Sequence, residues 1–213
     1  MKEVFVYVEG PSDQLSMEKL LAGAIEKGAE LGNAIGFYPL GGKEPLLKKG
    51  PLRALNILRN KPNSWVFLVP DLYPANKPFP HDSYNDLKKE LEQYFLRELE
   101  RKGCDKRLKD RFLIHCFKYD LEALLLASET ALMKRLGVSR FTQKWVTPVE
   151  DQNNQTPPKR IVEALFDDAG KKYKETSDAP WILERSDYEK LKERCPQNFM
   201  PFLKDLLDLL ENG

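Results

Sequence analysis

The chain has 213 residues, of which 41% are hydrophobic and 31% are charged, and its formal net charge is +1. This length fits one domain, or one domain with an appendage, and the near-zero charge does not indicate a strongly basic nucleic-acid binder. No apolar run reaches the roughly 20 residues that cross a bilayer, and we see no secretory signal at the start of the chain. Three widely spaced cysteines argue against a disulfide framework. We therefore expect a cytoplasmic protein that does not associate with membranes.

The first part of the chain is predicted to alternate between strands and helices. Continuous apolar runs predict the strands, and amphipathic periodicity predicts the helices. A loop with four prolines separates the third strand from the next helix. Such alternation predicts an α/β fold with a mostly parallel four-stranded sheet flanked by helices. The strands are expected at 3–8, 35–40, 65–69 and 111–117, and the helices at 13–27, 51–60 and 83–101.

After residue 118 the pattern becomes helical. We expect helices at 120–135, 157–168 and 198–210, with a polar loop before the second of them. We interpret residues 1–118 as an α/β core and residues 119–213 as a helical part packed on that core, forming a single structural unit. The last helix is strongly apolar on one face, so it could serve a homodimer.

Acidic residues follow three of the predicted strands. Glu9 closes the first strand, Asp71 follows the third after one proline, and Asp120 and Glu122 come just after the fourth. Because the carboxyl ends of parallel strands lie on one edge of a sheet, these side chains can approach one another. Clustered carboxylates repel unless a proton or a hard cation lies between them, and Mg²⁺ prefers oxygen ligands. The acids therefore indicate a magnesium or manganese site suited to phosphoryl transfer.

Structural roles are the alternative for several of these acids. Ser12 is a plausible N-cap of the first helix, and Asp13 suits the positive end of that helix. Asp120 could likewise be a charge at a helix N-terminus. Glu122 could be a surface residue, or it could form a salt bridge with a basic residue of the next helix.

Basic residues near the same edge predict contacts with phosphate. Lys43 follows two glycines at the end of the second strand, where a phosphate can approach the backbone, although a plain turn is the alternative. Lys159 and Arg160 lie in the first turn of a predicted helix, and they could hold a phosphate or pair with the acids. The segments 43–61 and 101–111 each carry six basic side chains, against one and two acids, so either segment could also contact phosphate.

Short motifs carry a resemblance to a known family. The Glu-Gly-x-x-Asp turn at 9–13 and the run Phe-Leu-Val-Pro-Asp at 67–71 resemble the Toprim fold of topoisomerases, primases and OLD-type nucleases. More closely, the chain is similar to the DUF4276 family of Toprim-like proteins. The motifs of that closer match are Val-Glu-Gly-Pro-Ser-Asp at 8–13, Tyr-Asp-Leu-Glu-Ala-Leu-Leu at 119–125, Thr-Pro-Pro-Lys-Arg-Ile at 156–161 and Cys-Pro at 195–196.

The resemblance implies a Toprim-like sheet and a role for each acid of the turn. It implies that Glu9 is a general acid/base or a metal ligand, and that Asp13 is a second metal ligand. Asp71 would be the first acid of an Asp-x-Asp metal motif. Tyr73 stands where that motif has its second aspartate, and a tyrosine is a poor magnesium ligand at neutral pH. Either an acid after the fourth strand supplies the missing carboxylate, or the metal site is weakened.

Two main hypotheses follow for the function. The first is a magnesium-dependent nuclease or related phosphoryl-transfer protein with Glu9, Asp71 and Glu122 as catalytic residues. In it, Glu9, Asp13, Asp71 and Asp120 bind Mg²⁺ or Mn²⁺. The second is a non-catalytic module that binds nucleic acid or a nucleotide and, as the resemblance implies, partners an ATPase in a defence-type gene pair. An enzyme that acts on a mononucleotide is a third alternative.

Overall fold

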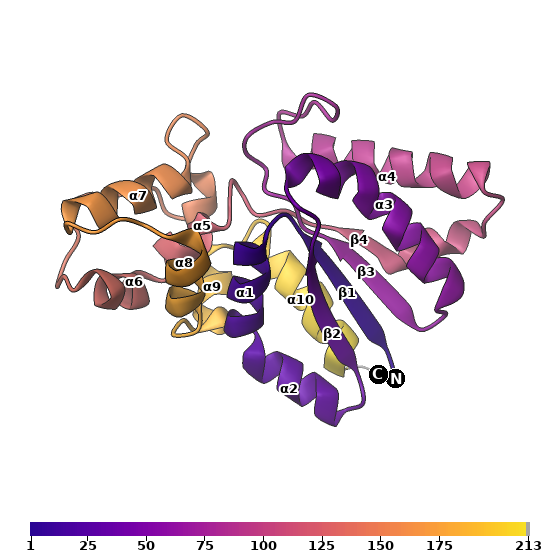
Figure 1. Ribbon diagram of the computed structural model, residues 1–213, viewed down its shortest axis with the longest axis horizontal. Coiled ribbons are helices and arrows are strands. Elements are labelled where there is room, and N and C mark those ends of the chain that lie inside the picture. Colours follow the sequence, from indigo (N-terminus) through magenta and orange to yellow (C-terminus); the bar gives the residue numbers. More distant parts are fainter. Residues whose placement is uncertain (212–213) are drawn as a thin grey trace.

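The computed structural model describes residues 1–211, and a four-stranded sheet lies at its centre (Figure 1). The strands are β1 (Glu3–Val8), β2 (Ala34–Pro39), β3 (Ser64–Leu68) and β4 (Phe112–Ile114). They lie in the order β2-β1-β3-β4, and every neighbouring pair is parallel. The predicted α/β fold with four strands is therefore confirmed, and the sheet is wholly rather than mostly parallel.

The chain reverses its direction across the sheet between β1 and β3. From β1 it reaches the edge strand β2 through α1 (Pro11–Leu20) and α2 (Ala22–Glu30), which pack on one face. It returns to β3 through α3 (Lys43–Asn60), on the opposite face, and α4 (Tyr84–Arg101) packs beside α3 and leads to β4. In open α/β sheets, the place where the strand order reverses is where ligands bind, at the carboxyl ends of the strands.

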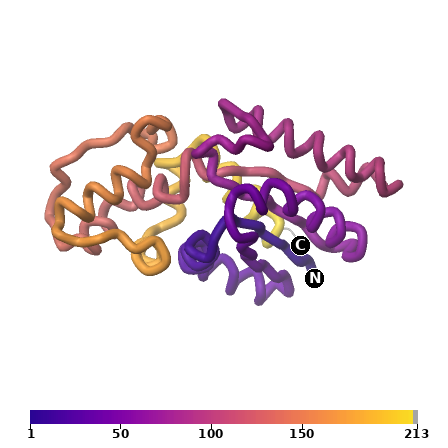
Figure 2. The backbone as a smooth tube through the Cα atoms, turned by 45° about the horizontal axis from the view of Figure 1, so that its top comes forward, coloured from indigo at the N-terminus to yellow at the C-terminus, as the bar shows by residue number. Residues whose placement is uncertain are grey.

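The later helices form a second part beside the carboxyl edge of the sheet, as Figures 1 and 2 show. From there α10 (Phe199–Glu211) returns to the sheet and covers the face on which α1 and α2 lie. The other later elements are α5 (Glu122–Ala127), α6 (Glu129–Leu136), a short 3-10 helix at Val149–Asp151, α7 (Pro158–Asp168), α8 (Glu175–Leu183) and α9 (Tyr188–Arg194). Another short 3-10 helix, Lys106–Arg111, lies between α4 and β4.

One apolar core joins the sheet to the last helix. Val4 and Val6 of β1 belong to the same buried cluster as Phe202, Leu203 and Leu206 of α10. Burying such side chains fully contributes about 1.5–3 kcal/mol each. Because the apolar face of α10 packs against the sheet of its own chain, the reason for predicting a dimer through this helix no longer holds.

Two helix boundaries differ from the prediction for identifiable reasons. The helix expected at 120–135 is interrupted at Ser128, whose hydroxyl donates to the carbonyl of Leu124 at 2.8 Å and so competes with helical backbone bonds. Helix α3 begins at Lys43 and not at residue 51, because Gly42 adopts a φ of 114° as its N-cap. Pro51 therefore lies inside this helix and does not start it.

Other predicted elements are shorter or divided. The helix expected at 13–27 is divided at Leu21 into α1 and α2. The fourth strand ends at Ile114, although the N–H of His115 still donates to the carbonyl of Leu68 at 3.0 Å. Helices α8 and α9 have no counterpart in the prediction, because they are short and their apolar periodicity is weak. The strands at 3–8 and 65–69 and the helices α4, α7 and α10 lie within one or two residues of their predicted places.

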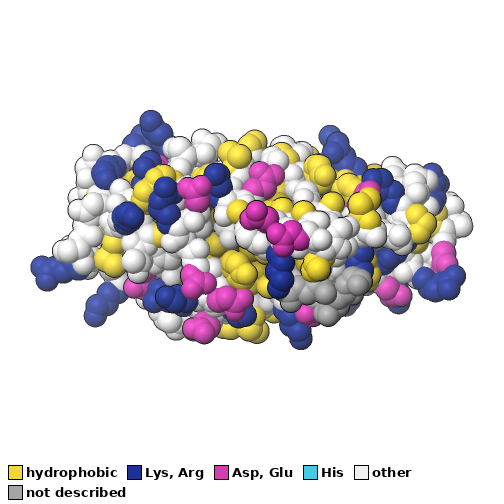
Figure 3. Space-filling model, turned by 90° about the horizontal axis from the view of Figure 1, so that it is seen from below, with side chains coloured by type: hydrophobic (Ala, Val, Ile, Leu, Met, Phe, Trp, Pro, Cys, Tyr) yellow, Lys and Arg dark blue, Asp and Glu magenta, His cyan; other side chains and the backbone are white. Residues whose placement is uncertain are grey.

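The surface agrees with the balanced composition of the chain. Acidic and basic side chains are interspersed on the face shown in Figure 3, as expected for a net charge of +1. No helix among residues 1–211 combines the length and the apolar character that crossing a membrane requires.

Candidate acidic site

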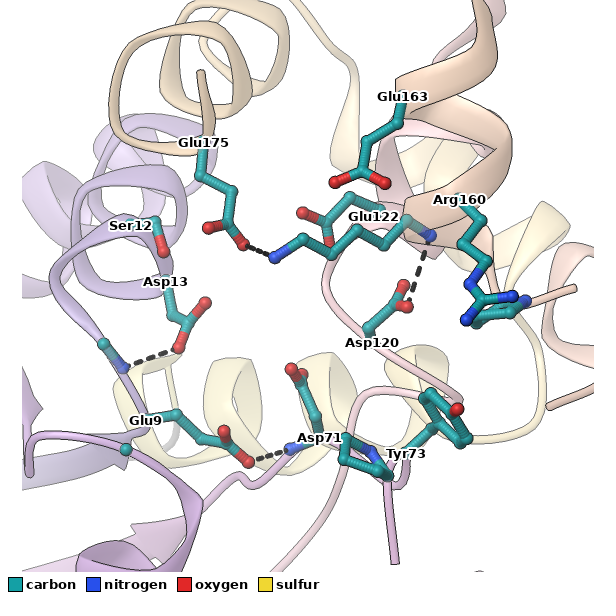
Figure 4. A pocket seen from close by; sticks show the side chains of 15 residues that line it. Glu9, Ser12, Asp13, Asp71, Tyr73, Asp120, Glu122, Arg160, Glu163 and Glu175 are labelled. Carbon is teal, nitrogen blue, oxygen red and sulfur yellow. Dashed lines mark hydrogen bonds and ion pairs between the residues drawn. The ribbon is translucent and has the colours of Figure 1, made fainter. Parts of the chain in front are cut away.

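A pocket of about 450 Å³ lies between the carboxyl edge of the sheet and the helices α7 and α8 (Figure 4). Seven carboxyl groups and two basic side chains line it, so its walls carry an excess of acids. The turns after β1 and β3 and the start of α1 provide one wall. The start of α5 and the first residues of α7 and α8 provide the other. The charged residues are Glu9, Asp13, Asp71, Asp120, Glu122, Lys159, Arg160, Glu163 and Glu175.

Glu9 and Asp71 meet at the point where the strand order reverses. Glu9 follows β1, and its Oε1 accepts a hydrogen bond from the backbone N–H of Asp71 at 2.9 Å. Asp71 follows β3 and is held by a parallel bridge to Phe117, which extends the pairing of β3 with β4. The N–H groups of Gly41 and Gly42 donate to the carbonyl of Glu9 at 3.0 and 2.8 Å. Backbone pairing on both sides thus fixes these two acids.

Asp13 organises the turn that carries Glu9. It is the third residue of α1, and its Oδ2 accepts from the N–H of Gly10, the N-cap, at 2.8 Å. The expectation that Ser12 is the N-cap is wrong, because the helix begins at Pro11 and Ser12 is already its second residue. Asp13 therefore serves the helix start with one oxygen and lines the pocket with the same carboxyl group.

Asp120 and Glu122 enter the pocket from the helical part. Oδ2 of Asp120 accepts from the backbone N–H of Lys159 at 3.2 Å, in the first turn of α7. Glu122 is buried, with 2% of its surface exposed, and its Oε1 accepts from the hydroxyl of Tyr173 at 3.1 Å. The alternative of a surface position for Glu122 is therefore wrong, and Tyr173 is its hydrogen-bond partner.

Burial raises the pKa of every acid at the centre of this pocket. Desolvation is the largest cause throughout, and it raises the pKa of Glu9 to about 7, of Asp120 to about 7 and of Glu122 to about 8. It raises the pKa of Asp13 to about 6. The pKa of Asp71 lies well above its usual range because its carboxyl group is desolvated and because the charges of the four other acids repel its ionised form.

The donor set fits a hard divalent cation. Oδ1 of Asp71 and Oδ1 of Asp120 are buried and accept no hydrogen bond from any described residue. Such unsatisfied oxygens are costly unless a proton or a cation compensates them, and carboxylates are the ligands that Mg²⁺ and Mn²⁺ prefer. Within residues 1–211, no three His, Cys, Asp or Glu side chains are arranged to hold one ion, so binding would require these carboxylates to close around it.

The three predicted phosphate ligands are placed differently from one another. The ammonium of Lys43 lies outside the pocket lining and donates to the carbonyls of Leu72 at 3.0 Å and Pro74 at 2.5 Å. Lys159 lines the pocket and forms an ion pair with Glu175. Burial would lower the pKa of Lys159, but this ion pair and the surrounding acids raise it.

Arg160 is the exposed basic group of the pocket. Its side chain lines the rim, and within residues 1–211 its guanidinium forms no hydrogen bond or ion pair. A guanidinium presents a planar set of donors that matches two phosphate oxygens. Of the three basic residues, Arg160 is therefore the one best placed to bind a phosphate from solution.

Sequence reasoning missed Glu163 and Glu175. Glu163 follows Lys159 by four residues, so the helical i, i+4 spacing was a signal that could have placed it beside the pocket. Glu175 begins α8 and reaches the pocket because α8 packs on α1, a long-range contact with no local signal. Tyr173 was missed for the same reason.

A family model and a solved structure are similar to this chain over most of its length. The family model described as "Domain of unknown function (DUF4276)" matches residues 8–207. Among solved structures, the C-terminal region of the Burkholderia pseudomallei OLD protein is similar, with a TM-score of 0.49 and 15% sequence identity. That match covers 97% of this chain and 99% of the other. None of the curated proteins matches the chain.

Proposed function

The chain belongs to the DUF4276 family, and from its acid pocket we propose that it is a divalent-metal-dependent nuclease or a related phosphoryl-transfer enzyme. One observation carries the proposal: two buried carboxylate oxygens, one on Asp71 and one on Asp120, accept no hydrogen bond among seven acids that line one pocket. An enclosed excess of carboxylates is stable when a cation neutralises it. The location at the strand-order reversal also supports a ligand site.

Four acids would hold the metal, and the basic residues would hold the phosphate. Glu9, Asp13, Asp71 and Asp120 offer carboxylate oxygens to Mg²⁺ or Mn²⁺. Such an ion, when bound, supplies a Lewis acid that polarises a phosphoryl oxygen and lowers the pKa of a coordinated water. Arg160 would bind the substrate phosphate at the rim.

Two acids are suited to proton transfer. The pKa of Glu9 is about 7, so its carboxyl group both takes up and releases a proton near neutral pH. Its Oε1 accepts from the N–H of Asp71, so Oε2 is the free atom, and this atom can hold either the proton or the metal ion but not both at once. The hydroxyl of Tyr173 donates to Oε1 of Glu122, so that bond orients the carboxyl group whether it is charged or neutral.

The proposal is tested by incubating the purified chain with Mg²⁺ or Mn²⁺ and with supercoiled plasmid, single-stranded DNA or RNA. Asp71→Asn keeps the size of the side chain but removes a metal ligand, and we expect it to reduce cleavage by about 100-fold or more. Glu9→Gln should do the same. Asp168→Asn is the matched control, because Asp168 is exposed at the other end of α7, and we expect its activity to equal the wild type.

Cleavage that is retained in Asp71→Asn and Glu9→Gln would reject the proposal. A folded wild type that cleaves none of these substrates with either metal would also count against it. Thermal unfolding of each variant shows whether a loss of activity reflects the site or the fold.

A binding module that works with an ATPase is the second candidate. Tyr73 lines the pocket at the place where a Toprim-type motif has a second aspartate, and this substitution favours binding over chemistry. In that case the chain would copurify with an ATPase encoded beside it, and Asp71→Asn would leave this association intact. Metal-dependent cleavage by the isolated chain would reject this candidate.

A further inference from the structure

Within residues 1–211, no helix covers one face of the edge strand β2. In β2, which pairs with β1, Gly36 lies beside Phe5 and Tyr38 lies beside Tyr7. These residues lie on the face of the sheet that α3 covers, but α3 packs mainly on β3 and β1. The helices α1 and α2 pack on the other face of β2. Tyr38, near the end of this edge strand, is consequently 42% exposed.

Tyr38 forms a flat aromatic surface on this face. A Cβ on Gly36 would lie only 2.4–2.7 Å from atoms of the Tyr38 side chain, so the missing side chain lets the ring lie along the strand. The ring stacks on Phe5 with 5.7 Å between centroids and 27° between planes. Covering a glycine is a structural role for such a ring. It also holds the ring rigidly, with its outer side open to a planar ligand.

Two basic side chains of α3 lie on the same side of the sheet as this ring. Lys49 and Arg53 are four residues apart on one side of the helix, and both are exposed. Arg53 lies close enough to Tyr7 to oppose by its charge the larger effect of burial, which raises the pKa of Tyr7. Within the described part of the chain, the side chains of Lys49 and Arg53 form no ion pair or hydrogen bond. This stripe is of one sign, unlike the mixed face in Figure 3.

The surface leads directly to the acid pocket. β2 ends at Pro39, and Gly42, four residues after Tyr38, lines the pocket. Four residues of chain span at most about 14 Å. A polymer whose base stacks on Tyr38 can therefore present a nearby phosphate to the pocket.

We propose that Tyr38, Lys49 and Arg53 form a binding surface for single-stranded nucleic acid that enters the acid pocket, an inference that rests on the proposed function. An unpaired base stacks on the outer side of the Tyr38 ring, and backbone phosphates face Lys49 and Arg53. The bases of a duplex already stack on one another, so a rigid exposed ring favours unpaired bases. DNA and RNA share this chemistry.

Binding is measured by the fluorescence anisotropy of labelled oligothymidine and oligouridine, in EDTA so that no metal-dependent cleavage occurs. We expect Tyr38→Ala to weaken binding by about tenfold, the value of one stacked base, and Tyr38→Phe to stay within about twofold of wild type. Arg53→Gln and Lys49→Gln should each weaken binding and reduce the salt slope by about 0.7. Arg140→Gln is the control, because Arg140 is exposed and lies outside both basic segments and the pocket, and it should change neither value.

Equal affinities of folded wild type and Tyr38→Ala would overturn the proposal, and so would tighter binding of a duplex of the same length. If Tyr38→Ala does not fold, an unchanged affinity of Arg53→Gln would overturn it, since Arg53 lies on the surface of α3. The experiments distinguish a failure of this proposal from a failure of the proposed function. If binding depends on Tyr38 but no substrate is cleaved, this surface is supported and the nuclease is rejected. If substrates are cleaved but binding does not depend on Tyr38, the nuclease is supported and this surface is rejected.

Discussion

At the scale of single residues, the pocket acids make the protein sensitive to pH. Burial raises the pKa of Glu122 to about 8 and of Glu9 to about 7, from an ordinary value of 4.5. Between the ordinary and the raised value, the native chain holds protons that the unfolded chain releases. The free energy of unfolding therefore falls as pH rises through this window, by about 1.4 kcal/mol per pH unit for each group that titrates. Below the ordinary pKa, these groups are protonated in both the native and the unfolded chain, so they do not lower the free energy of unfolding.

We expect the metal-free protein to unfold at a higher temperature near pH 5 than near pH 8, because the pocket acids must ionise at the higher pH. Glu122→Gln removes one of these groups and should reduce the difference. Mn²⁺ should raise Tm more near pH 8, where the carboxylates are charged. The measurement is thermal unfolding by circular dichroism in EDTA and in Mn²⁺. A Tm that rises with pH across this window in EDTA would contradict the expected direction.

The positions of some site residues could be predicted from the sequence, and those of others could not. Glu9 and Asp71 could be placed because each follows a continuous apolar run, and the edge of a parallel sheet brings such positions together. Lys43 was expected at the end of the second strand, but it begins α3, and its contacts with two loop carbonyls could not be foreseen. Glu175 could not be placed at all, because its position depends on the packing of α8 on α1.

At the scale of elements, the continuous apolar strands and the long amphipathic helices were predictable. The start of α3 was not, because Pro51 is typical of a helix start but here lies inside a helix that Gly42 initiates. The neighbouring Gly50 allows α3 to pack closely on the sheet. A Cβ at this position would lie 2.4 Å from a methyl group of Leu68 in β3, so α3 approaches the sheet at a residue without a side chain.

We expect Gly50→Ala to destabilise the protein by about 1–3 kcal/mol, because the steric conflict with Leu68 outweighs the gain of about 1 kcal/mol in helix propensity. Gly23→Ala is the matched control. Gly23 also lies in a helix, α2, and a Cβ there meets no atom within 4 Å. This control should gain about 0.5–1 kcal/mol. Urea unfolding of both variants provides the measurement, and a stabilised Gly50→Ala would show that α3 is free to shift.

At the scale of the whole molecule, the two parts of the chain share one core. The sheet face that carries Val4 and Val6 is covered in part by α10, which follows the rest of the helical part in sequence. The division into 1–118 and 119–213 thus describes the order of elements along the chain and not two separate cores. We propose that the two parts fold as a single unit.

A fragment of residues 1–118 should therefore fail to fold, since it exposes the apolar face that α10 covers. We expect no cooperative thermal transition for this fragment and strong binding of a dye specific for exposed apolar surface. The full chain serves as the control and should show one transition. A fragment that unfolds cooperatively near the Tm of the full chain would show two independent domains.

The side chain of Asn33 joins the beginning and the end of the described chain. Its Oδ1 accepts from the N–H of Lys2 at 3.0 Å, and its Nδ2 donates to the carbonyl of Leu210 at 2.9 Å. Both ends thus lie where the strands begin, whereas the acid pocket lies where they finish (Figure 1). Immobilising the protein on a sensor through either end would leave the pocket facing the solution, and both attachments should give the same substrate kinetics.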